Sequence, residues 1–453
     1  MTEFAVIVLA AGKGTRMKSD LHKVLHPLAG KPMLMHLLDS MAQLQPRRTV
    51  VVAGDRREQL DAALKGREGI TTALQEQQQG TAHAALQARE ALEGFSGNIL
   101  VCFGDVPMVR ADSVQRLIDA LAGDAKVAVL GFRPSDPLAY GRVIASDDGS
   151  VLKMVEYRDA SEAERSVDLC NSGLLAAHSD DLWPLLDAVD NENAAGEYYL
   201  PDVATGAIAR GARVVVIETA ADEVAGVNSR AELAALEARW QAVRRDQAMA
   251  EGATLRAPET VFFSHDTVLG RDVTIEPHVV FGPGVRIADH AYIKAYCHIE
   301  GAQIASGAAV GPFARLRPGA VMEENSFVGN FVEMKAATLG KGAKASHLTY
   351  LGDAEVGEGA NIGAGTITCN YDGYFKYKTT IGARAFIGSN SALIAPVTIG
   401  EDAIVAAGST VSRDVSAGEL RMVRAEQLVK DGWADRFHDA MKRKKEGAAK
   451  TKS

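Results

Sequence analysis

A glycine-rich segment near the N-terminus has the residue types of a phosphate site: Leu9-Ala10-Ala11-Gly12-Lys13-Gly14-Thr15-Arg16-Met17. It follows an apolar run, Phe4 to Ala11, that is typical of a buried strand. Its glycines therefore lie where the chain turns toward a helix, and backbone N–H groups at such a turn can bind phosphate oxygens. A dinucleotide-binding G-x-G-x-x-G motif would need Gly at Met17, and no P-loop spacing is present, so these two common sites are excluded.

Asp105 stands at the end of a second apolar run, Asn98 to Gly104. A carboxylate at a strand end suits Mg²⁺, because this hard cation is bound by a few carboxylates together with phosphate oxygens and water. The pattern therefore predicts a metal-binding carboxylate.

Together with Lys23, these residues resemble the sugar-phosphate nucleotidyltransferases, whose signature is L-A-A-G-x-G-T-R-M followed by a lysine. Further matches cover most of residues 5 to 230: Gln75 with Gln79-Gly80-Thr81, Phe103 to Pro107, Tyr140 to Arg142, Val155-Glu156, Asn171 to Gly173, Gly196 to Tyr199 and Gly226 to Asn228. The resemblance implies Mg²⁺-dependent transfer of a nucleotidyl group to a sugar phosphate. Both reactants are anions, so positioning and charge neutralisation supply the catalysis and no covalent nucleophile is needed.

The resemblance also implies roles for single residues. Asp105 and Asn228 hold one or two Mg²⁺ ions, and Arg16 and Lys23 neutralise phosphates as catalytic residues. The implied binding set for UTP and its sugar product is Leu9, Ala10, Ala11, Gly12, Lys23, Gln75, Gly80, Thr81, Phe103, Gly104, Asp105, Gly141, Glu156, Asn171 and Asn228. In this set Gln75, Gly80 and Thr81 read the base, and Gly141, Glu156 and Asn171 the sugar.

Two positions depart from the family pattern. The family commonly has proline before the lysine and tyrosine before Gly-Asp, where this chain has His22 and Phe103. Phe103 lacks a hydroxyl, so its side chain can pack or stack but cannot make the hydrogen bond that a tyrosine could make.

The elements that position these residues follow from the hydrophobic pattern. Residues 1–228 alternate apolar strands with amphipathic helices, which predicts a Rossmann-like α/β domain with a mostly parallel sheet. Residues 229–250 form a predicted linker helix, with a capping box at Ser229 and Glu232 and an apolar stripe at Leu233, Leu236, Trp240 and Val243.

From about residue 260 an aliphatic or aromatic residue recurs every sixth position, beginning with Leu269, Ile275, Phe281, Ile287, Ile293 and Ile299. The period resumes after one-residue slips, for example at Ile304, and fits a parallel β-helix of hexapeptide repeats with eighteen residues per coil. Residues 251–453 are assigned to this domain. The insert Asn370 to Lys378 is expected to form a loop on the binding face, and the tail from Lys442 is expected to be a disordered terminus.

Four runs in this half carry a second resemblance: Arg315 to Gly319, Val328 to Lys335, His347 to Asp353 and Asn361 to Gly373. They are similar to the bifunctional glucosamine 1-phosphate N-acetyltransferase and N-acetylglucosamine 1-phosphate uridylyltransferase family, nearly end to end. The resemblance implies acetyl transfer from acetyl-CoA to glucosamine 1-phosphate, then uridylyl transfer from UTP, feeding peptidoglycan and lipopolysaccharide synthesis. It also implies a left-handed coil and a homotrimer with active sites between subunits.

A protonated amine must lose a proton to attack a thioester, and histidine has a suitable pKa for that task. His347 is the candidate base, and Glu333 is expected to orient the substrate amine or share charge with it. The implied ligands of glucosamine 1-phosphate are Arg317, Lys335, Tyr350, Asn361 and Lys376. Those of acetyl-CoA are Ala364, Asn370, Tyr371, Ser389, Ala407 and Arg424.

Composition narrows the classes further. The 453 residues carry a net charge of −9, which argues against a general nucleic-acid surface. The four cysteines have no disulfide or zinc spacing, and no apolar run reaches the roughly 20 residues of a membrane helix. A cytoplasmic enzyme with small-molecule substrates is therefore expected. A nucleotidyltransferase with a structural or regulatory β-helix remains an alternative, and so does a non-catalytic scaffold, although intact Lys23, Asp105, Asn228 and His347 weigh against the scaffold.

Overall fold

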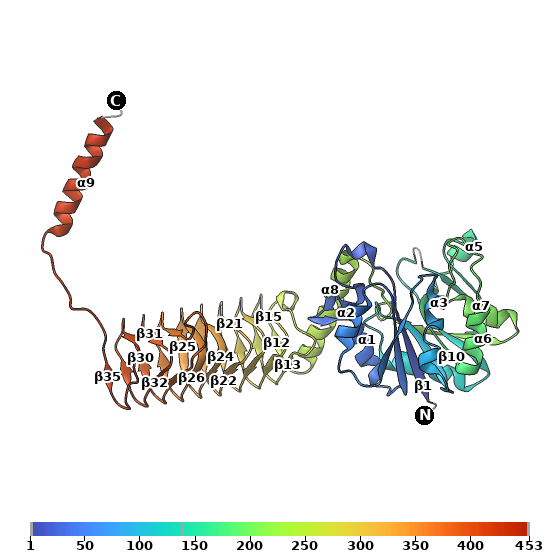
Figure 1. Ribbon diagram of the computed structural model, residues 1–453, viewed down its shortest axis with the longest axis horizontal. Helices are drawn as coiled ribbons and strands as arrows, with labels where there is room; N and C mark the ends of the chain where they lie inside the picture. The colour runs from blue at the N-terminus through green and yellow to red at the C-terminus, as the bar shows by residue number, and fades with distance from the viewer. Residues whose placement is uncertain (1–2, 138–139, 451–453) are drawn as a thin grey trace. The chain divides into compact units, whose positions relative to one another are not determined.

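The computed structural model describes residues 3–137 and 140–450, and the chain divides into two compact units (Figure 1). The first unit comprises Met1–Ala248 with Phe262–Asp266, and the second comprises Met249–Val261 with Thr267–Ser453. No helix among the described residues has the length and apolar character that crossing a membrane requires. The four cysteines are free thiols.

A nine-stranded sheet forms the centre of the first unit. Its main path is β11 (Arg213–Thr219), β7 (Ala125–Phe132), β10 (Cys170–His178), β6 (Asn98–Phe103), β1 (Phe4–Ala10), β4 (Arg48–Ala53) and β5 (Ile70–Leu74), with β8 (Arg142–Ala145) and β9 (Val151–Val155) beside it. Within that path β10 is antiparallel to both neighbours and the other pairs are parallel. The predicted mostly parallel sheet is confirmed.

Helices cover both faces of this sheet, which explains why every residue of β1 is buried. Apolar side chains of α1 (Met33–Ala42), α2 (Arg57–Leu64) and α4 (Ala111–Asp119) pack on one face. Those of α3 (Thr81–Leu86), α6 (Ser179–Asp187) and α7 (Asp202–Ala209) pack on the other. The short helix α5 (Glu162–Arg165) begins with its own capping box.

Helix α8 (Arg230–Ala250) begins at the capping box expected from the sequence. Ser229 Oγ accepts from the backbone N–H of Glu232 at 3.2 Å, and the Glu232 carboxylate accepts from the backbone N–H of Ser229 at 3.1 Å. Leu236 is buried. The prediction for Val243 is wrong: its side chain is 55% exposed, because the buried side of α8 runs through Leu236, Gln241 and Ala248 instead.

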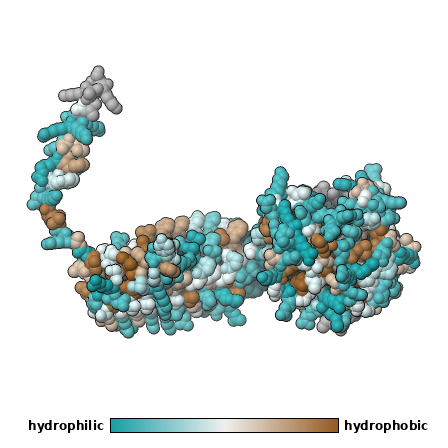
Figure 2. Space-filling model, in the orientation of Figure 1, coloured by the Kyte–Doolittle hydropathy of each residue, from teal (hydrophilic) through white to brown (hydrophobic). Residues whose placement is uncertain are grey.

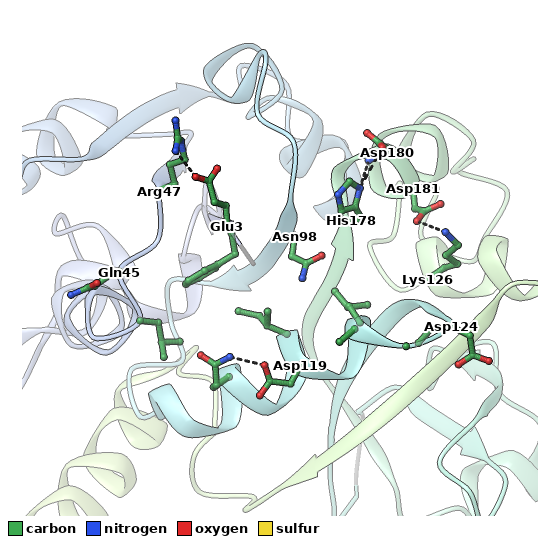
Figure 3. A pocket seen from close by; sticks show the side chains of 18 residues that line it. Glu3, Gln45, Arg47, Asn98, Asp119, Asp124, Lys126, His178, Asp180 and Asp181 are labelled. Atoms are coloured by element: carbon green, nitrogen blue, oxygen red, sulfur yellow. Dashed lines mark hydrogen bonds and ion pairs between the residues drawn. The ribbon is translucent and has the colours of Figure 1, made fainter. Parts of the chain in front are cut away.

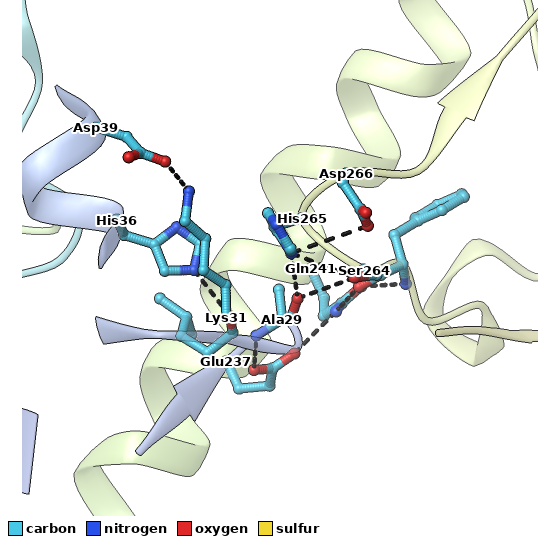
Figure 4. Close-up of polar contacts among 11 residues, drawn as sticks. Ala29, Lys31, His36, Asp39, Glu237, Gln241, Ser264, His265 and Asp266 are labelled. Atoms are coloured by element: carbon cyan, nitrogen blue, oxygen red, sulfur yellow. Dashed lines mark hydrogen bonds and ion pairs between the residues drawn. The ribbon is translucent and has the colours of Figure 1, made fainter. Parts of the chain in front are cut away.

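The segment 262–266 belongs to the first unit although its neighbours in sequence belong to the second. Gln241 of α8 holds it by a buried two-way bond, since its Oε1 accepts from Phe263 N at 2.8 Å and its Nε2 donates to Phe263 O at 2.7 Å (Figure 4). His265 N then donates to Ala29 O at 2.9 Å. Ala29 lies in the hairpin β2 (Pro27–Leu28) and β3 (Lys31–Pro32), four residues beyond the short helix that carries Lys23.

Replacing Gln241 with Ala should destabilise the first unit by about 2–4 kcal/mol, because it removes two buried hydrogen bonds to the Phe263 backbone. Urea unfolding followed by tryptophan fluorescence will measure this, since Trp183 and Trp240 both lie in this unit. Asp246→Ala, at an exposed position of the same helix, should change the free energy of unfolding by less than about 0.5 kcal/mol. Equal stability of the two variants would show that the Gln241 bonds to the 262–266 segment contribute nothing.

The second unit is a parallel β-helix of short strands. One ladder, a ten-stranded sheet, contains β12 (Thr254–Leu255), β14 (Thr274–Ile275), β17 (Tyr292–Ile293), β20 (Ala309–Val310), β23 (Phe327–Asn330), β25 (Lys344–His347), β27 (Asn361–Ile362), β30 (Phe386–Ile387), β33 (Ile404–Val405) and β35 (Leu420–Arg421).

A fourteen-stranded sheet makes up the rest of the coil. It contains β13 (Val268–Leu269), β15 (Val280–Phe281), β16 (Arg286–Ile287), β18 (His298–Ile299), β19 (Ala302–Ile304), β21 (Arg315–Leu316), β22 (Ala320–Met322), β24 (Glu333–Leu339), β26 (Tyr350–Val356), β28 (Ile367–Cys369), β29 (Thr379–Ile381), β31 (Ala392–Ile394), β32 (Val397–Ile399) and β34 (Thr410–Val411).

The register confirms the coil length predicted from the sequence. Thr274 pairs with Tyr292, eighteen residues later, and Tyr292 pairs with Ala309 after a one-residue slip. The period-six residues Ile275, Phe281, Ile287, Ile293 and Ile299 are all buried, because each hexapeptide turns one side chain inward. The insert Asn370 to Lys378 lies outside the ladders, as expected.

The expected disorder of the tail is wrong. Residues Trp433–Lys450 form helix α9, which includes the described part of the segment from Lys442. Lysine, arginine, glutamate and alanine are strong helix formers, so this polar sequence favours a helix even with exposed side chains.

Candidate active sites

A cavity of about 360 Å³ opens at the carboxyl ends of β1 and β6 in the first unit. Ligands of open α/β sheets bind at this end, where loops present N–H groups and side chains. Eleven residues predicted from the sequence line it: Leu9, Ala10, Ala11, Gly12, Lys23, Gln75, Gly80, Thr81, Phe103, Asp105 and Asn228. Gly104 lies beside them and donates its N–H to Leu9 O at 2.9 Å.

Lys23, Asp105 and Asn228 meet in this cavity. Lys23 Nζ forms an ion pair with Asp105 Oδ2 and donates to Asn228 Oδ1 at 3.2 Å. The side chains of the ion pair are only 14% and 15% exposed. Two oxygens from distant parts of the chain therefore converge on one cation.

The same two oxygens fit a magnesium ion by their chemistry. Within residues 3–137 and 140–450, no three His, Cys, Asp or Glu side chains are grouped as metal ligands. An ion held by Asp105 and Asn228 would take its other ligands from phosphate oxygens and water, which is how Mg²⁺ is usually bound in nucleotide enzymes.

The backbone around Lys23 is fixed by two neighbours. Lys23 opens a short helix, η2 (Lys23–Leu25), and His22 caps it because its Nδ1 accepts from Val24 N at 3.4 Å. The φ of His22 is −56°, close to the angle that proline imposes. Burial, then the Lys23 charge, lower the pKa of His22, which favours the neutral ring. The departure at position 22 thus keeps the local conformation.

Gly14 makes room for Lys23. A Cβ at position 14 would lie 2.7 Å from Lys23 Cβ, and the φ of Gly14 is +58°, a conformation that disfavours side chains. Position 14 therefore has to be glycine because the Lys23 side chain packs directly against it.

The side chains predicted to read the base are held by the protein. Gln75 is buried, and its Nε2 donates to Gly80 O at 3.1 Å and lies 2.9 Å from His83 Nδ1. Thr81 Oγ1 accepts from Leu200 N at 2.8 Å. These bonds leave the Gln75 carbonyl and the Thr81 hydroxyl proton as an acceptor and a donor for a ligand.

The three residues predicted to read the sugar come together but do not line the cavity. Asn171 N donates to Gly141 O at 2.9 Å, and a Cβ at Gly141 would lie 3.2 Å from Glu156 Oε1. Burial, followed by the negative charge of Asp202, raises the pKa of the Glu156 carboxyl.

Phe103 packs its ring against Gly173. A Cβ at position 173 would lie 2.3 Å from the ring, at a φ of +84°. The irregular part of β10 from Asn171 to Gly173 therefore leaves space for the aromatic ring of Phe103.

Arg16, which was predicted to neutralise phosphates, also lies outside this cavity. It lies in a short helix, η1 (Thr15–Met17), with an exposed side chain, and it does not line the cavity. Gln78 and Glu197 do line it and were not singled out from the sequence. Gln78 and Glu197 stand within or beside the motif runs around Gly80 and Tyr198. The sequence of a loop does not show which of its side chains point into a cavity, so these two could not be selected.

A larger cavity of about 1060 Å³ lies at the other end of the strands (Figure 3). Glu3, Asn98 and Lys126 contribute to its wall. None of the catalytic, metal-binding or substrate-binding residues predicted from the sequence lines this cavity. It opens at the amino ends of β1, β6 and β7, away from the end where ligands of such sheets bind.

In the second unit, a row of residues along the β-helix contains the candidate base. We call it the His347 row: Asn330, His347, Ala364, Ser389 and Ala407. Backbone bonds join its coils, from Leu348 N to Asn330 O (3.0 Å), Gly365 N to His347 O (3.4 Å), Asn390 N to Ala364 O (2.7 Å) and Gly408 N to Ser389 O (2.8 Å). The small side chains that follow His347 leave room on the surface for an extended ligand.

Three cations lie close together near the fourteen-stranded sheet: Lys335 is in β24, Arg317 follows β21, and Lys376 belongs to the insert. The adjacent Lys376 ammonium, and after it Arg317, lower the pKa of Lys335. Tyr350 is in register with Glu333, and Gly352 with Lys335, on the next coil. Crowded like charges are unfavourable unless an anion binds, so this cluster suits a phosphate.

Glu333 and His347 have different partners. Glu333 Oε1 accepts from Arg317 Nη1 at 2.8 Å. The His347 ring instead bonds to Asn330, whose Oδ1 lies 2.5 Å from Nδ1. Asn330 was missed from the sequence, although it stands in the run Val328 to Lys335.

The remaining predicted residues lie around these two groups. Asn361 is in register with Lys344 and so belongs to the sheet of His347 rather than to the cation cluster. Asn370 Nδ2 bonds to Asp353 at 2.5 Å, and Tyr371 is 60% exposed in the insert. A Cβ at Gly408 would lie 3.7 Å from Arg424 Cδ, so Arg424 borders the end of the His347 row.

Comparison with known proteins matches both units. Residues 6–165 match the MobA-like NTP transferase domain, and residues 266–301 and 378–413 match the bacterial transferase hexapeptide repeats. The chain is 64% identical to Bifunctional protein GlmU of Sphingopyxis alaskensis over 97% of this chain and 98% of the relative. It is 67% identical to the protein of that name in Novosphingobium aromaticivorans over the same shares, and 54% identical to that of Zymomonas mobilis over 97% and 99%. Two domain matches and full-length relatives at these identities show that the chain belongs to the GlmU family of bifunctional proteins.

Proposed function

We propose that the chain catalyses two consecutive reactions, acetyl transfer to glucosamine 1-phosphate in the second unit and uridylyl transfer to its product in the first. The observation that carries the proposal is that each unit holds its own set of reactive side chains. Lys23 meets Asp105 and Asn228 in the first unit. The second unit holds the hydrogen-bonded His347 and a separate cluster of three cations. A structural β-helix would need neither a base nor a cation cluster.

In the first reaction the amine of glucosamine 1-phosphate attacks the thioester carbonyl of acetyl-CoA. A C–N bond forms, the C–S bond breaks, and the amine proton passes to His347 and then to the departing thiolate. Arg317, Lys335 and Lys376 neutralise the sugar phosphate, and the small residues of the His347 row leave space for the acyl carrier.

In the second reaction a phosphate oxygen of N-acetylglucosamine 1-phosphate attacks the α-phosphorus of UTP, and the bond to the β-phosphate breaks to release pyrophosphate. Lys23 neutralises charge on the phosphates, and Gln75 and Thr81 orient the base. Asp105 and Asn228 hold Mg²⁺, which supplies charge stabilisation at the phosphate oxygens when bound.

Purified protein tests the proposal. With glucosamine 1-phosphate and acetyl-CoA it should release CoA thiol. With UTP and N-acetylglucosamine 1-phosphate it should release pyrophosphate only when Mg²⁺ is present. Absence of the thiol signal alone would favour a nucleotidyltransferase with a structural β-helix.

The chain is further proposed to form a homotrimer, and an aromatic ladder on the β-helix supports self-association. His278, Tyr296, Phe313 and Phe331 stack with ring centroids 4.8, 4.8 and 5.4 Å apart, and Leu348 follows on the next coil. The four apolar members are 46–61% exposed, and Figure 2 shows apolar side chains at the β-helix surface.

All five ladder residues have φ between 51° and 61°. This left-handed conformation costs roughly 1–2 kcal/mol for a residue with a side chain. Other non-glycine residues of the β-helix with positive φ are only Ala, Asp, His, Asn or Arg within the described ranges. Large apolar side chains at one corner are therefore explained if a second copy of the chain covers them.

Phe313→Glu should shift the protein from the mass of three chains of 48.1 kDa toward that of one, measured by analytical ultracentrifugation. Its charge would be desolvated in a copy-to-copy contact, which is costly. Asn325→Glu adds the same charge at another positive-φ position and should leave the mass unchanged. A Phe313→Glu protein of unchanged mass would rule out the ladder as the contact.

A further inference from the structure

The imidazole of His347 has one hydrogen-bond partner among the described residues, the Asn330 side chain. Asn330 Oδ1 lies 2.5 Å from His347 Nδ1. A carbonyl oxygen can only accept, so the Nδ1 atom must carry the proton that is shared. The other ring nitrogen, Nε2, then has the lone pair.

The backbone holds the two side chains in this arrangement. Asn330 and His347 are paired in register in β23 and β25, and the following residues, Phe331 and Leu348, both have positive φ. Leu348 N donates to Asn330 O at 3.0 Å, which ties the two turns together. The ring is therefore oriented by a partner on a rigid neighbouring coil, not by a mobile loop.

We infer that Asn330 is a positioning residue for acetyl transfer: its carbonyl accepts the Nδ1 proton of His347, fixes the ring, and presents the Nε2 lone pair to the substrate amine. The inference rests on the proposed role of His347 as the base. A base with the wrong tautomer or a rotating ring would spend little time in the productive state.

The charges around the ring show why the partner is an amide. The strands paired with β25 are β23 and β27, with sequences FVGN and NI, so neither carries an ionisable side chain. Lys344 lies in β25 itself, and Glu333, Lys335 and Tyr350 lie in β24 and β26. A carboxylate at position 330 would instead stabilise the protonated imidazole directly, which would keep the base protonated at neutral pH.

Two variants separate these effects. Asn330→Ala removes the acceptor, so kcat for acetyl transfer should fall by about 10–100-fold at every pH, with the KM for glucosamine 1-phosphate nearly unchanged. Asn330→Asp keeps the acceptor but adds charge. The pKa of the base should rise, so the acidic limb of the kcat/KM profile should move to higher pH by about one unit and the rate should recover at alkaline pH.

The measurement is the pH profile of CoA thiol release by the full-length protein, with uridylyl transfer as the internal check of folding. Asn325→Ala, which removes an asparagine from another corner of the β-helix, should match the unmodified protein. An unmoved profile in Asn330→Asp, or full activity in Asn330→Ala, overturns the inference. If His347→Ala also keeps full acetyl transfer, the assignment of His347 as the base is wrong. If His347→Ala loses acetyl transfer while the Asn330 variants behave normally, only the inferred role of Asn330 is wrong.

Discussion

Uridylyl transfer will be lost in Asp105→Asn, with kcat lower by about 10³-fold or more, while acetyl transfer stays at its original rate. Asn has nearly the same shape as Asp, so the loss isolates the charge. That charge pairs with Lys23 in a cavity wall where both side chains are largely buried, and it is the carboxylate expected to hold Mg²⁺. Removing a charge interaction worth several kcal/mol in such a site corresponds to a rate loss of this size.

Pyrophosphate release at increasing Mg²⁺ concentrations is the measurement. A variant that recovers at high Mg²⁺ has lost affinity for the ion, whereas one that stays inactive has lost a group needed in the reaction itself. Asp119→Asn, at the exposed end of α4, is the matched control and should behave like the original protein. Full uridylyl activity in Asp105→Asn would contradict the proposed site.

The second large effect is expected for His347→Ala, which should lower kcat for acetyl transfer by about 10²–10⁴-fold and leave uridylyl transfer intact. The amine of the substrate is protonated near neutrality, and without the imidazole neither neighbour of position 347 in the row can take the proton. Asn330 and Ala364 flank His347 in the row, and neither side chain is basic.

The thiol assay across pH provides the check. Because an unprotonated amine needs no base before attack, the residual rate of His347→Ala should rise with pH toward the pKa of the amine itself. His290→Ala, at an exposed corner of the same β-helix, should retain the activity. Loss of both activities in His347→Ala would instead indicate that the two units are not independent.

Much of this arrangement could be predicted from local patterns. The burial of β1 follows from an unbroken apolar run, and the start of α8 follows from the Ser229 and Glu232 capping box. Local pattern also misled. Val243 fits the apolar stripe of α8 but is exposed, because the side of the helix that is buried runs through Leu236, Gln241 and Ala248. The tail looked disordered because it is polar, yet its helix propensity is high and α9 includes it.

The hydrophobic pattern is enough to predict both architectures: the alternating strands and helices of the first unit and the six-residue period of the β-helix. Both rest on side chains a few residues apart, whose burial is a local property of the backbone. Which side chains meet depends instead on how distant parts of the chain fold together. Lys23 contacts Asp105 and Asn228, which stand 82 and 205 residues away. Asn330 reaches His347 because the coil between them is seventeen residues long. The hydrogen-bond partner of His347 therefore depends on the register between coils, and the six-residue period does not specify that register.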